Sequence, residues 1–357
     1  MFGVDQQRGR LFYRSVGLRG GWNPAAPLRS LSEGESPYTY GLLTRTGHLV
    51  PAKAAKTEAF SLGEPILAGV LFPGTVSYLV LLGTTRCWAK GLIAPVEKTP
   101  TPPFTETSNP LWHGCAMMSS MTNVVVVNNS GVDKPHYWDG GSGKFVTLAD
   151  APKAKSVLGW LGRLFCGGVY DSENEVWFLN RLQWSEEGDI TSWPLTGTSG
   201  FEDLADEGDL IQRLSRSQGN YLRVLRNASA WAALPTTDPY SPFTLEYIGN
   251  RGILAPNSLQ RLTKDTDIFL GADDIYMLGA TLEPVGWKIR RELFGRADGT
   301  RLQYAWSFVD PLSSEYYLVV DLKDGTRRAY ILNWQELTWM QQDLTGYTCL
   351  LSWYEDA

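Results

Sequence analysis

Histidine and cysteine are scarce in this sequence, which has three histidines and four cysteines among 357 residues. The seven residues are His48, His113, His136, Cys87, Cys115, Cys166 and Cys349. None stands at the spacing of a zinc site, a redox CxxC pair or a catalytic triad. We therefore expect no metal and no other cofactor, and we interpret the cysteines as small apolar core residues in a reducing compartment.

Long apolar runs and an excess of basic charge are also missing. The longest apolar runs, Tyr78–Leu82 and Val124–Val127, fall far short of the roughly 18 residues that a membrane-spanning helix needs. Residues 1–18 contain three arginines and no apolar stretch, so they lack the pattern of a secretory signal peptide. The net charge is −6, which argues against a surface built to hold nucleic-acid phosphates.

Motifs of common nucleotide-binding and hydrolytic sites are missing too, namely GxGxxG, GxxxxGK(S/T), GxSxG and HExxH. Asp267 and Glu315 are candidate strand carboxylates, but nothing in the sequence pairs them for glycoside hydrolysis. The acidic run 202–209 lacks the ligand spacing of an EF-hand, and like residues 171–175 it is expected to be a solvated loop. The sequence predicts a protein that is not an enzyme, and it leaves open whether the run 202–209 holds a cation.

Aromatic and turn-forming residues are plentiful, with 14 Trp, 16 Tyr, 13 Phe, 36 Gly and 20 Pro. Short apolar runs bounded by turn residues dominate, which is typical of β-strands, and helical periodicity is nearly absent. Six times, an apolar strand is followed by a turn and by a second strand with an aromatic ring near its middle. The six rings are Trp88, Trp138, Trp177, Trp231, Tyr276 and Tyr330.

These repeated units predict the fold. The apolar strands are expected at 78–84, 123–129, 163–169, 221–227, 266–272 and 315–321. Upstream strands are expected at 66–72, 112–118, 155–160, 210–216, 258–263 and 302–309. More polar fourth strands are expected at 144–148, 190–195, 243–248 and 337–344. Antiparallel units repeated at roughly 40 to 50 residues predict an all-β, six-bladed β-propeller with the six rings packed between blades, although five to seven blades fit the spacing. Two β-sandwich domains divided near Thr198–Asp209 are the alternative.

The two ends of the chain differ from the repeat. Residues 1–60, rich in Arg, Gly and Pro, predict an extended N-terminal arm, with a flexible tail as the alternative. Residues 61–357 form the predicted propeller, which a C-terminal strand at 347–353 closes by pairing with the first blade or with residues 39–52. An arm of this kind often docks on a neighbouring subunit, and the Pro-rich segment 98–110 is expected to be an extended, exposed connection between blades. The candidate contact residues are Arg8, Arg10, Arg14, Arg19, Trp22, Pro102 and Pro103.

A set of ordered motifs lies between about residues 120 and 280. It comprises Asn128–Gly140 (NNSGVDKPHYWDG), Ala151–Ala154, Gly162–Phe165, Val176–Phe178, Trp184–Ser185, Gly188–Trp193, Gly208–Ile211, Leu222–Leu225, Gly249–Ala255 and Ile268–Tyr276. In these residues the chain resembles the β-propeller nozzle proteins of short-tailed bacteriophages, also called tail tubular or packaged-DNA stabilisation proteins.

The resemblance implies a structural protein of the virion tail that is made in the host cytoplasm. Such proteins form a ring, usually of six copies, below the portal and its adaptor, where they extend and seal the DNA channel. The implied partners are further copies of the chain, the adaptor or head-completion protein, a tail needle, fibre or tailspike, and double-stranded DNA in passage. The chain is shorter than larger family members, so their tip domains are expected to be missing.

A net-negative subunit suits this role if its acidic residues face the channel, because DNA would then slide past few basic contacts. Two other functions remain open from the sequence. One is a monomeric propeller that binds another protein, and the other is a glycan-degrading propeller hydrolase or lyase. The sequence does not fix the copy number of the ring, its distal partner or the residues that line its channel.

Overall fold

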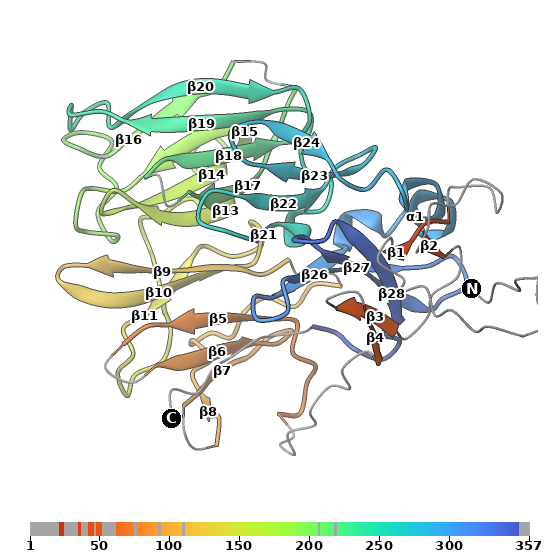
Figure 1. The fold of residues 1–357 in the computed structure, drawn as a ribbon. Coiled ribbons are helices and arrows are strands. Elements are labelled where there is room, and N and C mark those ends of the chain that lie inside the picture. The colour runs from red at the N-terminus through yellow and green to blue at the C-terminus, as the bar shows by residue number, and fades with distance from the viewer. Residues whose placement is uncertain are drawn as a thin grey trace, which may run out of the picture.

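Six four-stranded antiparallel sheets are arranged in a ring in the computed structural model, which makes the chain a six-bladed β-propeller (Figure 1). The structure describes residues 21–24, 35–36, 42–45, 48–51, 62–74, 77–91, 94–108, 111–205, 208–217 and 220–349. The predicted all-β, six-bladed fold is confirmed. The alternative of two β-sandwiches is wrong, because Gly200–Asp203, inside the expected division, is the outermost strand of the third blade.

Each blade is made of four strands that follow one another in the sequence. The innermost strands are β5 (Ala68–Phe72), β9 (His113–Ser119), β13 (Lys153–Trp160), β17 (Ile211–Arg216), β21 (Gln260–Arg261) and β25 (Trp306–Asp310). The second strands are β6 (Tyr78–Leu82), β10 (Thr122–Asn128), β14 (Arg163–Asp171), β18 (Leu222–Arg226), β22 (Asp267–Leu270) and β26 (Glu315–Asp321). The third strands are β7 (Cys87–Lys90), β11 (His136–Trp138), β15 (Val176–Trp184), β19 (Ala230–Pro235), β23 (Ile275–Leu278) and β27 (Arg327–Asn333). The outermost strands are β8 (Val96–Glu97), β12 (Val146–Thr147), β16 (Gly200–Asp203), β20 (Phe243–Gly249), β24 (Leu282–Pro284) and β28 (Thr338–Asp343).

The hydrophobic core is divided among the interfaces between blades. Five clusters of buried apolar side chains lie between consecutive blades, from blades 1 and 2 through blades 5 and 6. A second strand has a neighbouring blade on both faces, so it is a continuous apolar run instead of an alternating one. In β10, all of Val124–Val127 is buried. This double coverage explains why the second strands are the clearest signal in the sequence.

The interface between blade 6 and blade 1, here called the seam, is built differently. Two cavities, of about 480 and 180 Å³, are lined by residues of both blades, and none of the five apolar clusters in the described part of the chain joins them. The C-terminal segment crosses the seam, since the Thr348 hydroxyl donates to the Ile66 carbonyl at 2.6 Å and Arg327 donates to the Tyr347 carbonyl. Residues 347–349 are not in a strand, and the rest of the strand predicted at 347–353 lies outside the described residues.

The described parts of residues 1–60 form two small sheets. Strands β1 (Gly21–Trp22) and β2 (Glu35–Ser36) pair in parallel, and β3 (Leu42–Arg45) and β4 (His48–Pro51) form an antiparallel pair. Both β1 and β3 lie against β28 of blade 6 (Figure 1). Residues 39–52, one of the two expected pairing partners of the C-terminal strand, thus contain a pair of strands beside the last blade, as far as they are described.

Two further features differ from the sequence predictions. The fourth strand predicted at 190–195 is wrong: Ile190 and Trp193 are buried between blades 2 and 3 in a turn that the Trp193 Nε1–H closes on the Ile190 carbonyl (2.8 Å). Three short helices were not anticipated, namely η1 (Pro256–Ser258), α1 (Arg290–Arg296) and η2 (Leu302–Tyr304). Leu293 of α1 is buried between blades 5 and 6. Among the described residues, no helix is long and apolar enough to cross a membrane.

Candidate functional site

The six predicted rings all lie on third strands, at different depths. Four of them, Trp88, Trp138, Tyr276 and Tyr330, are buried, whereas Trp177 and Trp231 are half-buried. Trp138 lies between blades, with its ring centroid 5.4 Å from the rings of Phe72 and Tyr78 in blade 1. The ring of Trp177 covers Gly131 of blade 2 so closely that a Cβ there would lie 2.4 Å from it.

A second aromatic cluster, which the sequence analysis missed, joins blades 3 and 4. Its members are Trp160, Phe165, Trp184 and Phe243, with ring centroids 5.1–6.2 Å apart. These rings come from a first, a second, a third and a fourth strand of their blades. They therefore share no position in the repeat by which the sequence could identify them. The aromatic content of the sequence therefore serves packing between blades at more positions than the repeat indicated.

The connection from blade 1 to blade 2, residues 98–108, is fixed in place. Phe104 is buried, with its ring centroid 4.8 Å from Trp112 and 4.9 Å from His136. The backbone N–H and hydroxyl of Thr105 donate to the carboxylate of Asp133 at 2.9 and 2.6 Å. Beside these anchors, the predicted contact residues Pro102 and Pro103 are exposed.

The motif Asn128–Gly140 provides these anchors. The Asn129 amide nitrogen donates to Asp133 Oδ2, and the Asp133 backbone N–H donates to Asn129 Oδ1, both at 2.8 Å. Burial raises the pKa of Asp133, but the hydrogen bonds from Thr105 and Asn129 outweigh it, so the pKa lies below its usual value. Lys134 donates to the Ala149 carbonyl. The side chains of this motif thus hold the chain in shape.

Lys98 connects the other end of this segment to blade 2. Its ammonium group donates to the carbonyls of Gly141 and Ser142, each at 3.0 Å, and lies 5.1 Å from the centroid of the Trp138 ring. A cation over a tryptophan face at this distance is an attractive contact. The connection is therefore held from both ends.

The acidic residues predicted to be solvated have mixed roles. Asp209 is buried, 3.5 Å from the Arg226 guanidinium, and accepts a hydrogen bond from Ser229, so its prediction as a solvated residue is wrong. Asp203 forms an ion pair with Arg181, Glu202 is exposed, and residues 206–207 lie outside the described part. Within the described residues, no group of three or more His, Cys, Asp or Glu could hold a metal ion.

The other acidic stretch and the two candidate strand carboxylates also form contacts inside the protein. Asp171 accepts hydrogen bonds from the backbone N–H groups of Glu173 and Asn174 in an exposed turn. Glu315 is buried and accepts a hydrogen bond from the Tyr317 hydroxyl at 2.8 Å. Asp267 is buried beside Arg223, as described next. Each of these carboxylates thus has a hydrogen-bond or ion-pair partner within the protein.

A buried ion pair joins blades 4 and 5. The Arg223 Nη1 atom lies 2.8 Å from Asp267 Oδ2, and both side chains are almost fully buried. Asp267 also accepts a hydrogen bond from the Ser215 hydroxyl at 2.7 Å. Arg223 further donates to the carbonyls of Asp265 (2.6 Å) and Gly279 (3.3 Å), so the guanidinium is held on several sides.

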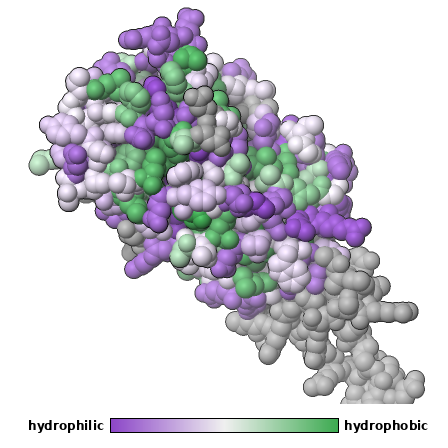
Figure 2. All heavy atoms as spheres, turned by 90° about the horizontal axis from the view of Figure 1, so that it is seen from above, coloured by the Kyte–Doolittle hydropathy of each residue, from purple (hydrophilic) through white to green (hydrophobic). Residues whose placement is uncertain are grey.

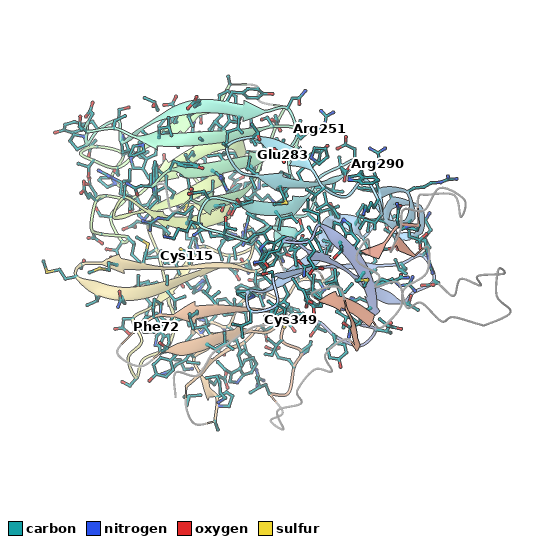
Figure 3. All side chains as sticks on the ribbon, in the orientation of Figure 1. Phe72, Cys115, Arg251, Glu283, Arg290 and Cys349 are labelled. Atoms are coloured by element: carbon teal, nitrogen blue, oxygen red, sulfur yellow. The ribbon has the colours of Figure 1, made fainter. Side chains whose placement is uncertain are left out.

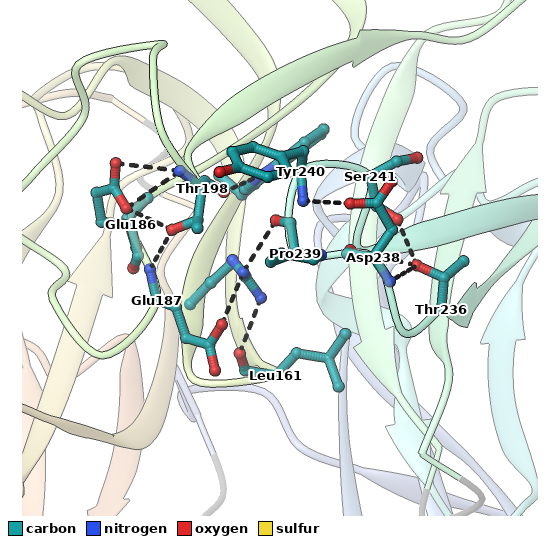
Figure 4. A network of polar contacts seen from close by, with 12 residues as sticks. Leu161, Glu186, Glu187, Thr198, Thr236, Asp238, Pro239, Tyr240 and Ser241 are labelled. Carbon is teal, nitrogen blue, oxygen red and sulfur yellow. Dashed lines mark hydrogen bonds and ion pairs between the residues drawn. The ribbon is translucent and has the colours of Figure 1, made fainter.

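Arg163 connects blades 3 and 4 nearer the surface. Its guanidinium donates to Glu187 at 2.9 Å, to the Pro239 carbonyl at 3.2 Å and to the Leu161 carbonyl at 3.4 Å (Figure 4). Glu186 beside it accepts hydrogen bonds from Thr198. The network fixes the β19–β20 loop against blade 3.

A cavity of about 480 Å³ lies where the innermost strands meet, here called the axial cavity. Its wall includes Val70 of β5, Gly114 of β9, Arg213 of β17, Arg261 of β21 and Phe308 of β25. The two arginines are its charged residues, and no acidic residue among the described ones lines it. The wall is therefore positively charged within a chain of net negative charge.

On the face of the molecule seen in Figure 2, apolar side chains lie in several groups with polar side chains between them. On this side Arg251 and Glu283 lie near the outer end of blade 5 (Figure 3). Arg251 donates to the Tyr276 hydroxyl at 3.2 Å and lies 3.4 Å from Asp273.

The predicted contact residues of the arm cannot be placed. Arg8, Arg10, Arg14 and Arg19 lie outside the described residues, and of Trp22 only the backbone, in β1, is described. They remain predictions.

No known protein family matches the sequence. No curated protein matches it either. Among solved structures, the chain is similar to the extracellular domain of a one-component system from B. thetaiotaomicron (10% identity, TM-score 0.43, 76% of this chain and 32% of that chain). It is also similar to virginiamycin B lyase from Staphylococcus aureus (10% identity, TM-score 0.44, 77% of this chain and 83% of that chain). A third similar structure is puromycin hydrolase (11% identity, TM-score 0.46, 84% of this chain and 49% of that chain). The chain thus spans about a third of the first and half of the last, and the fold assignment rests on its own six sheets.

Proposed function

We propose that this chain is a structural subunit of a bacteriophage tail, a nozzle-type propeller that assembles as a ring below the portal adaptor. One observation carries the proposal. In the motif Asn128–Gly140, on which the resemblance to nozzle proteins chiefly rests, Asn129, Asp133 and Lys134 make hydrogen bonds inside the protein. A motif whose polar groups maintain shape favours a scaffold over an enzyme.

The connection 98–108 supports the same function. Pro102, Pro103 and Glu106 are exposed, while Phe104 and Thr105 between them are anchored to blade 2. An exposed segment that is already ordered loses little conformational entropy on binding, which favours association. We therefore assign this segment the contact with a neighbouring subunit or with the adaptor.

The test is the mass and shape of the assembled protein. We expect light scattering after size exclusion to give a multiple of 39.7 kDa, ideally six, for the chain alone or mixed with the adaptor from the same genome, and negative-stain images to show rings. Pro103→Asp should weaken this assembly. The matched control is Pro284→Asp, at an exposed proline of β24 next to Glu283 (Figure 3), which should assemble normally.

Two results would overturn the proposal, and a third would overturn the assigned contact. A chain that stays monomeric and never joins the adaptor favours a propeller that binds some other protein. Turnover of a host surface polysaccharide by the purified chain would make it an enzyme. Equal assembly of Pro103→Asp and Pro284→Asp would remove the connection 98–108 from the contact.

A further inference from the structure

Arg213, in the wall of the axial cavity, is half-buried and lacks the carboxylate partner that the deeply buried arginines have. Arg163, Arg223 and Arg226 each have a carboxylate within 2.8–3.5 Å. Arg213 has no carboxylate partner among the described residues, and its Nη1 atom is buried without a hydrogen-bond partner. A guanidinium that lines a cavity and has no carboxylate beside it can pair with an anion that enters from solution.

The titratable groups near Arg213 do not supply that charge. His113 is buried, and burial, followed by the charge of Arg213, holds its pKa well below the usual value, so the imidazole is neutral at pH 7. Burial raises the pKa of the Cys115 thiol to about 12 and that of Cys349, in the cavity wall, to about 11. All three groups are uncharged at neutral pH. Arg213 itself stays charged, because burial lowers its pKa only to about 10.

His113 is a second unpartnered polar group near Arg213, whose charge adds to burial in lowering the pKa of the imidazole, but it is not part of the cavity wall. Its side chain is 2% exposed, and neither ring nitrogen has a hydrogen-bond partner in the described structure. A neutral imidazole has one N–H to donate and one nitrogen to accept. Both groups are left unused, so the surroundings of Arg213 are short of hydrogen-bond partners.

Arg261 is the other charged residue of the cavity wall. Its guanidinium is 3.8 Å from Asp267, but that carboxylate is already engaged by Arg223 at 2.8 Å. The Arg261 side chain is 37% exposed, and Leu71, also in the wall, is 51% exposed, so the cavity reaches the surface. A small solute can enter by this side.

From these observations we infer that the axial cavity binds a small oxyanion, a phosphate or a carboxylate, on the guanidinium of Arg213. A guanidinium binds both through two parallel N–H···O contacts. The volume of about 480 Å³ falls in the range of small-molecule sites. The inference is independent of the tail assignment, because it concerns the inside of one subunit.

The experiment measures binding of two probes, inorganic phosphate and succinate, by isothermal titration calorimetry and by the shift in melting temperature. Both are carried out at pH 7 with ionic strength held constant by sodium chloride. We expect the melting temperature of the wild-type protein to rise with at least one probe, and the better probe identifies the class of anion. Arg213→Met should weaken its binding roughly 10- to 100-fold, the worth of a charge-assisted hydrogen bond.

The matched control is Arg216→Met, which removes an exposed arginine of the same strand and should bind as the wild type does. Arg213→Lys keeps the charge but not the paired N–H groups, so weakened binding by this variant supports the site even if Arg213→Met does not fold. The inference fails if neither probe raises the melting temperature of the wild type. It also fails if Arg213→Lys binds as the wild type does, or if Arg216→Met loses binding equally, which would indicate unspecific surface binding.

Discussion

The ion pair between Arg223 and Asp267 offers the sharpest test of how the blades are held together. It joins β18 of blade 4 to β22 of blade 5, and both side chains are almost fully buried. Replacing Asp267 by Asn removes the negative charge at nearly constant volume. Replacing Arg223 by Met removes the positive charge and leaves an apolar chain of similar length.

The magnitudes follow from what each change leaves behind. Breaking a buried pair by removing one partner costs about 3–5 kcal/mol. Asp267→Asn should lie near about 3 kcal/mol, because Arg223 keeps the carbonyls of Asp265 and Gly279 as acceptors. Arg223→Met should cost more, because Asp267 keeps only the Ser215 hydroxyl and Arg261 at 3.8 Å. The double variant buries no unpaired charge, so its cost should fall below the sum of the single costs by at least about 2 kcal/mol.

The assay is equilibrium unfolding in urea, supported by melting temperatures. A loss of about 3 kcal/mol corresponds to a drop of roughly 4 °C for a chain of 357 residues, at about 2.1 cal/mol/K of unfolding entropy per residue. The control pair is Arg181 and Asp203, which makes contacts of 2.6 and 2.7 Å at the surface and should be worth about 1 kcal/mol or less. If Asp267→Asn costs no more than Asp203→Asn, or if the double variant costs the full sum, the buried pair does not hold the blades.

Three further changes test packing, backbone approach and acid sensitivity. Trp138→Ala should lower the free energy of unfolding in urea by about 3–5 kcal/mol, because it leaves a cavity between blades 1 and 2. Tyr247→Ala, at a half-exposed ring, should lower it far less, and equal losses would contradict the packing. Gly252→Ala should lower the melting temperature strongly, since its Cβ would lie 2.0 Å from a backbone oxygen, and Gly143→Ala, with open space around it, should not; similar melting temperatures would refute this. Asp133→Asn should be less stable than the wild type at pH 7, and this difference should shrink as the pH falls below about 4, because the lowered pKa shows that the fold is stabilised by the charged carboxylate. A difference in stability that stays constant down to about pH 3 would contradict this.

The sequence predicts the strands that are covered by a neighbouring blade on both faces. It is less successful for elements that lack this double coverage. The run Val124–Val127 is apolar because blades 1 and 3 cover its two sides, and such runs fix the blade count. Four of the six outermost strands have only two to four residues, so nothing distinguishes β16 from the buried turn at 190–193. Helix α1 has only seven residues, too few for a helical period to emerge.

The site residues were harder to predict for a different reason. Arg223 and Asp267 come together from different blades, and the pairing of two strand charges so far apart leaves no local pattern in one sequence. Asp209 lies in an acidic run that has the composition of a solvated loop, and only its position beside Arg226 shows that it is buried. Arg213 stands out because no carboxylate is paired with it among the described residues. A single sequence does not show which side chains lie beside one another in the fold.

At the seam between blades 6 and 1, both the packing of the blades and the candidate site are hard to predict from the sequence. Five interfaces are filled by apolar side chains, which need only hydrophobicity and volume and so leave a readable pattern. Because every blade is made of consecutive strands, no strand is shared between blade 6 and blade 1, and closure depends on side chains and on the segment around Thr348. That interface holds cavities in place of an apolar cluster, and Arg213 lines the larger one. The interface that lacks an apolar cluster among the described residues is thus also one that leaves room for a ligand.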